Sequence, residues 1–220
     1  MSMAPDAPKR LEGRKVAAVA CFDSFGKVAM TLLAACRREG AETTLHLLEL
    51  NNRALSRRQR LEIRRIDPRT PIEKHNWSDL HNLCSPMAGD VDALILGLDG
   101  RRSREALLQL QGAWGLGQTR PRLISAYPGI LFRFALEGML DRSGADLLCL
   151  NSQQDLSIYQ KGCAAMGLDS SNAVVTGLPI LWRTHPRTDL PEHPSIVFFE
   201  QPSIPVHPLQ RRFICAQLRD

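Results

Sequence analysis

The stretch KVAAVACFDSFGK, residues 15–27, decides the fold. After Lys15, every residue up to position 22 is apolar, which is typical of a strand that is buried on both faces. Residues 26–38 then follow a helical pattern that ends at Gly40, a residue type favoured just after helix C-termini. A buried strand that leads directly into a helix is the building unit of a parallel α/β sheet.

The same unit recurs along the chain. Further apolar runs of strand length lie at residues 43–50, 91–98, 122–126, 146–150 and 173–176. Helical patterns lie at residues 56–66, 103–113, 130–142 and 157–166. Ser103 is the expected N-cap of its helix, and the irregular residues 71–89 predict only a short helix near 78–83. The sequence therefore predicts an α/β fold, a Rossmann-like doubly wound parallel sheet of about six strands.

Two kinds of segment flank the predicted domain, which spans residues 15–180. Residues 1–14 are polar and Pro-rich, and we expect them to be flexible. Residues 181–194 are also rich in proline and predict a linker. Residues 195–220 hold one apolar strand and one helix-like segment. This C-terminal strand-helix extension either begins a second domain or folds back onto the first.

Composition favours a soluble, cytoplasmic protein. The net charge of +5 is a mild basic bias that fits an anionic ligand or an anionic membrane surface. The six cysteines form no C-x-x-C pair, which indicates a reducing compartment. No apolar run reaches the roughly 18 residues of a membrane span, so any membrane contact would be peripheral, at the inner face. An exposed strand after residue 195 could support a homodimer by strand addition.

The sequence also contains a basic stretch and a group of potential metal ligands. The arginines of the stretch are Arg53, Arg57, Arg58, Arg60, Arg64, Arg65 and Arg69. We favour a solvated helix face, with contact to an anionic membrane as the alternative; nucleic acid is disfavoured because few aromatics are interleaved. The potential ligands are Asp79, His75, His81 and Cys84. Their spacing matches no standard zinc pattern, so no metal is predicted.

The first candidate binding turn follows residues 15–22. Ligands of doubly wound sheets bind at the carboxyl ends of the strands, where helix N-termini offer free N–H groups. Asp23 and Ser24 could cap the helix or touch a hydroxylated substrate, Gly26 allows a close backbone approach and Lys27 adds a cation. The alternative is a plain capped helix, because the turn has neither a G-x-G-x-x-G nor a Walker pattern.

A second candidate turn follows residues 122–126. Pro128 and Gly129 bend the chain there, and Tyr127 could stack on or hydrogen-bond a sugar or a base. If the strand order reverses between residues 15–22 and 122–126, this turn faces the first one across a crevice.

Two further groups follow strands at the same edge. Asn151, Ser152 and Gln153 either line the cleft or serve only to cap a helix near Ser157. Asp99 follows residues 91–98 and is a candidate general base.

Several segments resemble a known family. LISAYPGI at 123–130, RSGADLLCLNS at 142–152 and TGLP at 176–179 resemble the N-terminal domain of GT-B glycosyltransferases, and more narrowly a family of uncharacterised bacterial glycosyltransferases. Residues 196–202, IVFFEQP, resemble the first strand of that family's second Rossmann-like domain. The resemblance spans residues 15–218.

The resemblance implies a transferase whose first domain receives the acceptor and whose second domain holds most of a nucleotide-sugar donor. Asp23 or Asp99 would deprotonate the acceptor hydroxyl, and the two turns would cradle the acceptor or the distal end of the donor. The nucleotide-sugar would be a co-substrate, with no metal or other cofactor. Because nearly all of the donor domain is missing after residue 195, we expect this chain to be inactive alone. The alternative is a non-catalytic Rossmann-like domain that binds a small anion or a nucleotide; a dinucleotide oxidoreductase is less favoured, since the glycine fingerprint is absent.

Overall fold

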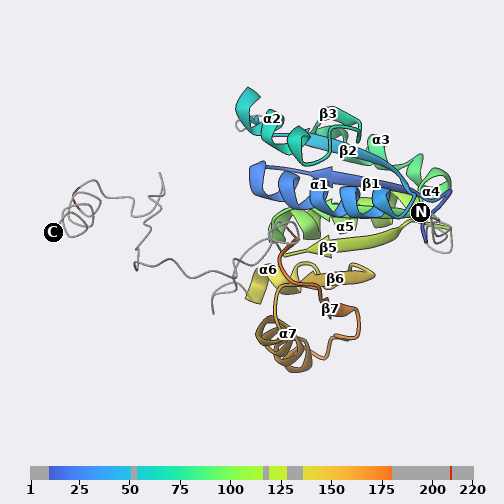
Figure 1. The fold of residues 1–220 in the computed structure, drawn as a ribbon. Coiled ribbons are helices and arrows are strands. Elements are labelled where there is room, and N and C mark those ends of the chain that lie inside the picture. Colours follow the sequence, from blue (N-terminus) through green and yellow to red (C-terminus); the bar gives the residue numbers. More distant parts are fainter. Residues whose placement is uncertain (1–9, 51–53, 116–118, 128–135, 180–208, 210–220) are drawn as a thin grey trace, which may run out of the picture. The chain divides into compact units, whose positions relative to one another are not determined.

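The computed structural model describes residues 10–50, 54–115, 119–127, 136–179 and 209 (Figure 1). The chain divides into two compact units, Met1–Thr184 and His185–Asp220. The fold described below belongs to the first unit. Of the predicted linker and the strand-helix extension, all but Leu209 lie outside the described residues.

The described part of the chain folds around one sheet of seven parallel strands, in the order β3-β2-β1-β4-β5-β6-β7. The strands are β1 Lys15–Ala20, β2 Glu42–Glu49, β3 Ile72–Asn76, β4 Ala93–Gly97, β5 Arg122–Ala126, β6 Leu147–Leu150 and β7 Ala173–Val175. This order extends in both directions from β1 and β4, as in a Rossmann-like sheet. The prediction of a doubly wound parallel sheet is confirmed.

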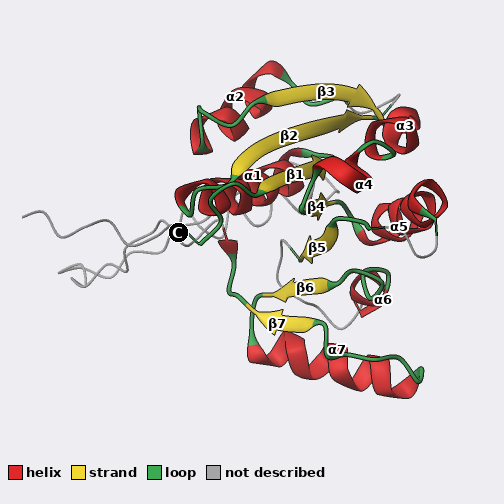
Figure 2. Cartoon of the chain, turned by 90° about the vertical axis from the view of Figure 1, so that its right-hand side faces the viewer, coloured by secondary structure: helices red, strands yellow, loops and turns green. Residues whose placement is uncertain are grey.

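Helices cover both faces of the sheet (Figure 2). They are α1 Asp23–Arg38, α2 Arg57–Ile66, α3 Leu80–Cys84, α4 Met87–Asp90, α5 Gly100–Trp114, α6 Leu136–Leu140 and α7 Gln153–Ala165, with a 3-10 turn η1 at Trp77–Asp79. On one face, Met30 and Leu33 of α1 pack with Ala18 of β1. On the other face, Leu110 of α5 packs with Val19 of β1. The alternation of β1 side chains between two buried clusters explains why its sequence is apolar throughout.

Three sequence predictions about elements were wrong or incomplete. The strand β3 was missed because Ile72–Asn76, IEKHN, is mostly polar, as befits an outermost strand with an exposed face. Ser103 is not the N-cap of α5; Asp99 is, and Ser103 is buried inside the helix. The helix after β6 begins at Gln153 rather than near Ser157, while its cap, Ser152, is one of the residues expected to cap it.

Close packing joins α5 to α6 at Gly100. A Cβ atom placed on Gly100 would lie 2.6 Å from the Cα of Gly138 and 3.1 Å from its carbonyl oxygen. Backbone atoms cannot move aside as a flexible side chain can. The first residue of α5 therefore has to be glycine for the two helices to approach this closely.

A second link joins the starts of β5 and β6. The carboxylate of Asp146 accepts hydrogen bonds from Nη1 and Nη2 of Arg120, at 2.6 and 2.8 Å, and from the N–H of Leu123 at 2.8 Å. The hydrogen bonds from Arg120, followed by the one from Leu123, hold the pKa of Asp146 below its usual range against the opposing effect of burial.

We expect Gly100→Ala to lower the free energy of unfolding by about 1–3 kcal/mol, the usual cost of overpacking. Gly112→Ala is the matched control, because it lies in the same helix with open space around it. That change should leave stability unchanged or raise it by up to about 1 kcal/mol, because alanine favours helix. Urea unfolding midpoints measure both; equal midpoints for the two variants would contradict the close packing.

We expect Asp146→Asn to cost about 1 kcal/mol at neutral pH, a modest value because Arg120 is partly exposed. A carboxyl whose folded pKa is depressed stabilises the fold above its unfolded pKa, about 3.9, and loses this effect as pH falls through the folded pKa. The stability difference between parent and variant should therefore be constant above about pH 5 and shrink below pH 4. Denaturant titrations across pH, with exposed Asp90→Asn as control, test this; a difference that stays constant down to about pH 2 would refute it.

Candidate functional site

The topological switch point lies between β1 and β4. On one side of this pair the sheet continues through β2 and β3, and on the other through β5, β6 and β7. Open α/β sheets bind ligands outside the carboxyl ends of the strands at such a point. The strand order does not reverse between β1 and β5, because β4 lies between them. The turn at Tyr127 therefore does not face the first turn directly. The turns directly opposite each other are those that follow β1 and β4.

The turn after β1 holds a strained residue. Phe22 has φ 62°, and among the described residues it is the only non-glycine with positive φ. A bulky residue in this region stores conformational strain, a feature that clusters at functional sites. The guanidinium carbon of Arg102 lies 5.0 Å from the centre of the Phe22 ring, within cation–π range. The contact links the turn after β1 to the start of α5.

The turn after β4 holds a carboxylate with a guanidinium partner. Asp99 Oδ1 accepts the backbone N–H of Arg102 at 3.0 Å, and Oδ2 accepts its Nη1 at 2.5 Å. Asp99 therefore caps α5 and fixes the Arg102 side chain that stacks on Phe22. The sequence singled out Asp99 but missed Arg102 and Phe22. The available signal for Arg102 was its position three residues after an aspartate at a helix start.

The turn after β5 is held by a buried guanidinium. Arg142 is 1% exposed, and its Nη2 donates to the carbonyl oxygen of Leu98 at 2.6 Å. Its Nη1 donates to the carbonyl oxygen of Gly138, and the guanidinium lies 5.3 Å from the ring centre of Tyr127. Burial lowers the pKa of Arg142 to about 10, which leaves it charged at neutral pH. Arg142 thus connects the end of β4 with Tyr127; Pro128 and Gly129 lie outside the described residues.

The predicted open turn from Asp23 to Lys27 is the first turn of α1. Lys27 Nζ donates to Asp23 at 2.9 Å and to Glu62 of α2 at 2.8 Å. Gly26 is buried, and a Cβ there would lie 2.7 Å from the Cδ1 of Ile63. Gly26 and Lys27 therefore have a packing role between α1 and α2, which the sequence did not indicate. Ser24 is exposed.

Asp23 retains one carboxylate oxygen without a hydrogen bond. Its Oδ2 accepts from Lys27, whereas Oδ1 is buried and has no hydrogen-bond partner in the described part of the chain. The side chain as a whole is 31% exposed. Because Oδ1 is buried, the carboxylate would have to turn for this oxygen, with its free lone pairs, to accept a proton from a hydroxyl.

The polar residues after β6 lie farther from the switch point, since β5 separates β6 from β4. The Oγ of Ser152 accepts the backbone N–H of Asp155 at 3.1 Å, so Ser152 caps α7. Asn151 is half-buried and Gln153 is exposed as the first residue of α7. Arg142 joins Tyr127 to the carbonyl oxygen of Leu98, the residue before Asp99. The hydrogen bond described for Ser152 stays within the first turn of α7 and does not reach Asp99 or Tyr127.

An apolar groove of about 970 Å³ lies between α5 and α6. Leu107 and Leu110 of α5 and Leu136 and Leu140 of α6 line it. Its charged residues include Arg104 and Asp141, which form an ion pair at 3.3 Å. The groove lies between two helices and not at the carboxyl ends of the strands, so we place the candidate site at the switch point instead.

The basic stretch forms the outer side of α2, whose one buried residue is Ile63. Arg58 pairs with Glu62 at 3.0 Å, and Arg60 donates to the carbonyl oxygen of Leu55. Arg57, Arg64 and Arg65 are exposed, as expected of a solvated helix face, while Arg53 lies outside the described residues. Contact with a membrane surface stays a prediction. Within the described ranges, the structure has no helix that is both long and apolar enough to cross a bilayer.

Comparison with known proteins gives one family match. A family model described as "Putative glycosyltransferase (DUF6716)" matches residues 16–220, nearly the whole chain. None of the curated proteins matches the chain.

Three solved structures are similar at low identity. LpCGTa in complex with UDP has a TM-score of 0.48 and 13% identity, over 74% of this chain and 52% of its own, so this chain spans about half its length. A short-chain dehydrogenase/reductase from Serratia marcescens BCRC 10948 has a TM-score of 0.43 and 8% identity, over 79% and 100% of the two chains. A protein from Lactobacillus casei has a TM-score of 0.40 and 12% identity, over 63% and 74%. Likenesses of this strength carry no argument about activity.

We expect Arg142→Ala to lower the free energy of unfolding by about 2 kcal/mol or more, because two carbonyl groups lose a charged donor. Arg142→Lys should rescue little, since an ammonium group cannot bridge both carbonyls and stack on Tyr127 at once. Arg101→Ala is the control: its side chain is 80% exposed, so the change should stay within about 0.5 kcal/mol. Equal stability of Arg142→Ala and Arg101→Ala in denaturant titrations would contradict this role of Arg142.

Proposed function

Because the chain belongs to the family described as "Putative glycosyltransferase (DUF6716)", we propose that it transfers a sugar from a nucleotide-sugar donor to an acceptor hydroxyl. The described domain would provide the acceptor side of a GT-B-type transferase. The nucleotide-sugar is the co-substrate, and the proposal requires no further cofactor. The observation that carries the proposal is the position of two aspartates at the switch point.

Each of the two strands that flank the switch point is followed by an aspartate. Asp23 begins α1 after β1, and Asp99 caps α5 after β4. Transfer to a hydroxyl needs a base for the departing proton and positive groups for the leaving diphosphate. The N-termini of α1 and α5 point their partial positive charges at the same edge of the sheet, next to the guanidinium of Arg102.

The hydrogen bonds of the two carboxylates favour Asp23 as the base. Both oxygens of Asp99 already accept hydrogen bonds from Arg102. Asp23 uses one oxygen for Lys27, and its other oxygen has no partner in the described ranges. We therefore assign proton abstraction to Asp23. Asp99 is assigned the positioning of Arg102.

The acceptor would bind against two aromatic rings, Tyr127 and Phe22, at the carboxyl edge of the sheet. Tyr127 follows β5 and is fixed by Arg142, while Phe22 is fixed by Arg102. Aromatic faces of this kind suit the apolar faces of a sugar ring or another cyclic acceptor. Ser24, exposed on the first turn of α1, offers a hydroxyl beside Asp23. Pro128, Gly129, Asn151 and Gln153 complete the proposed acceptor side.

The test uses the full-length protein and a panel of nucleotide-sugars, with release of nucleoside diphosphate as the readout and water as acceptor. Asp23→Asn should lower kcat by about 100-fold or more, the usual contribution of a general base, without changing the Kd of the donor in calorimetry. Asp99→Asn should have a smaller effect, because the amide oxygen still caps α5. Exposed Asp169→Asn should match the parent.

The outcomes distinguish a transferase from a non-catalytic nucleotide-binding domain. Equal rates for Asp23→Asn and the parent would remove Asp23 as the base. A parent protein that binds nucleotides but turns over no donor would favour the non-catalytic nucleotide-binding alternative. A parent that binds no nucleotide-sugar would exclude the transferase proposal.

A further inference from the structure

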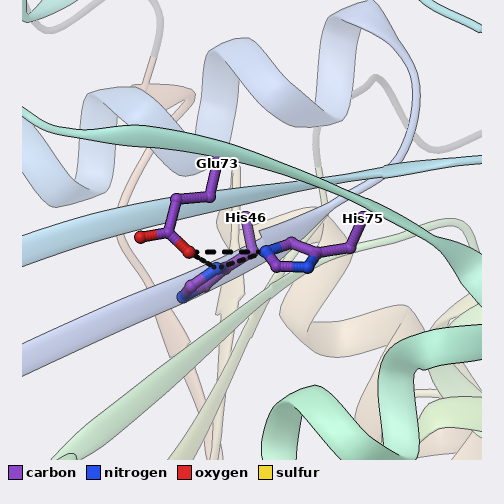
Figure 3. Close-up of side chains that lie close together, drawn as sticks. All are labelled: His46, Glu73 and His75. Carbon is purple, nitrogen blue, oxygen red and sulfur yellow. Dashed lines mark hydrogen bonds and ion pairs between the residues drawn. The ribbon is translucent and has the colours of Figure 1, made fainter.

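Three side chains with metal-binding atoms converge on one face of β2 and β3 (Figure 3). His46 belongs to β2, and Glu73 and His75 belong to β3. In the parallel register His46 is opposite Glu73, and Leu48 is opposite His75. Since side chains two residues apart point to the same face of a strand, Glu73 and His75 both lie on the face of His46. The position of the three groups is thus set by the backbone of the sheet.

The three facing atoms form a nearly equilateral triangle. His46 Nδ1 lies 3.2 Å from His75 Nε2 and 3.3 Å from Glu73 Oε2, and His75 Nε2 lies 3.4 Å from the same oxygen. A tetrahedral zinc ion binds nitrogen and oxygen at about 2.0–2.1 Å, which separates neighbouring ligand atoms by about 3.3–3.4 Å. The observed separations match this spacing on all three sides.

Hydrogen bonding alone leaves this triangle unsatisfied. Each imidazole nitrogen presents either one proton or one lone pair, and a carboxylate oxygen presents only lone pairs. If one nitrogen is protonated, the other nitrogen and the oxygen face each other with lone pairs. If both are protonated, two N–H groups face each other. A cation at the centre would accept a lone pair from all three atoms.

We propose that His46, Glu73 and His75 bind one divalent transition-metal ion of the zinc type. Two imidazoles and one carboxylate form a ligand set known for zinc, and it leaves a coordination position open.

The site is accessible and separate from the proposed transfer site. His46 and Glu73 line a hollow of about 320 Å³ together with Glu42, Thr44 and Asp90. Glu73 is 55% exposed, so an ion can enter from solvent and hold water at its open position. Lys15 and Glu42, at the amino ends of β1 and β2, line the same hollow, whereas Asp23 and Asp99 follow the carboxyl ends. The proposal does not depend on glycosyl transfer, and failure of one leaves the other untouched.

A bound ion would stabilise the pairing of the outermost strand, β3, with β2. The strand β3 has five residues and is the first in the sheet order. Two side chains of β3 and one of β2 would bind the same ion. This link would add to the backbone hydrogen bonds between β2 and β3. Binding should therefore raise the Tm of the protein.

The experiment titrates the metal-stripped full chain with Zn²⁺ in calorimetry and with Co²⁺ in visible absorption. We expect one ion per chain and a Co²⁺ spectrum without the thiolate charge-transfer band that cysteine ligands would give. His75→Ala should weaken binding at least about 100-fold, more than loss of an outer-shell partner. Glu73→Gln, a change at an exposed side chain, should weaken it less and keeps the test valid if His75→Ala folds poorly.

The matched control is His81→Ala, which removes an exposed histidine on α3 outside the cluster. This variant should bind Zn²⁺ with the same affinity as the parent. The proposal is overturned if the parent binds no Zn²⁺, if His75→Ala and Glu73→Gln both bind as tightly as the parent, or if the Co²⁺ spectrum shows thiolate ligands.

Discussion

The structure depends on the pairing of β1 with a strand on each side. Residues 16–20 of β1 are all buried, and the strand forms parallel ladders with both β2 and β4. A Cβ on Gly97 of β4 would lie 3.0 Å from the Cβ of Ala20 and 3.1 Å from that of Ala29 in α1. Small residues at this crossing let α1 pack close to β4. The turn that carries Phe22 and Asp23 is thereby brought to the place where the sheet order reverses.

Charged groups at the switch point are fixed by secondary structure. Asp99 caps α5, Arg102 stacks on Phe22, and Arg142 links the end of β4 to Tyr127. Because each group is held by a backbone atom or an ion pair, the proposed transferase would need little further ordering when it binds its substrate, as electrostatic catalysis requires. His46, Glu73 and His75 are held in place in the same way, by the register of β2 and β3.

The strands that are apolar on both faces could be predicted, because burial leaves a continuous signal in the sequence. The strand β3 could not, since Glu73, Lys74 and His75 are polar. The strand order could not be predicted either, because nothing local indicates that β4 separates β1 from β5. The position of Tyr127 opposite the first turn could therefore be stated only as a condition. Gly26 resembled a ligand contact, yet the helix α2 that packs on it is distant in sequence. The meeting of His46 with His75 depends on the register of two strands, which hydrophobicity does not encode.

The exposed face of β3 also limits how the sheet can associate. An unpaired outer strand is a template for another chain, and its risk is lowest where charged side chains stand along it. Here Glu73 and Lys74 alternate sides on the outermost strand, and both are about half exposed, at 55% and 51%. A strand added from another molecule would have to strip water from one or both charges. The polar sequence that hid β3 from prediction thus protects this border of the sheet against aggregation.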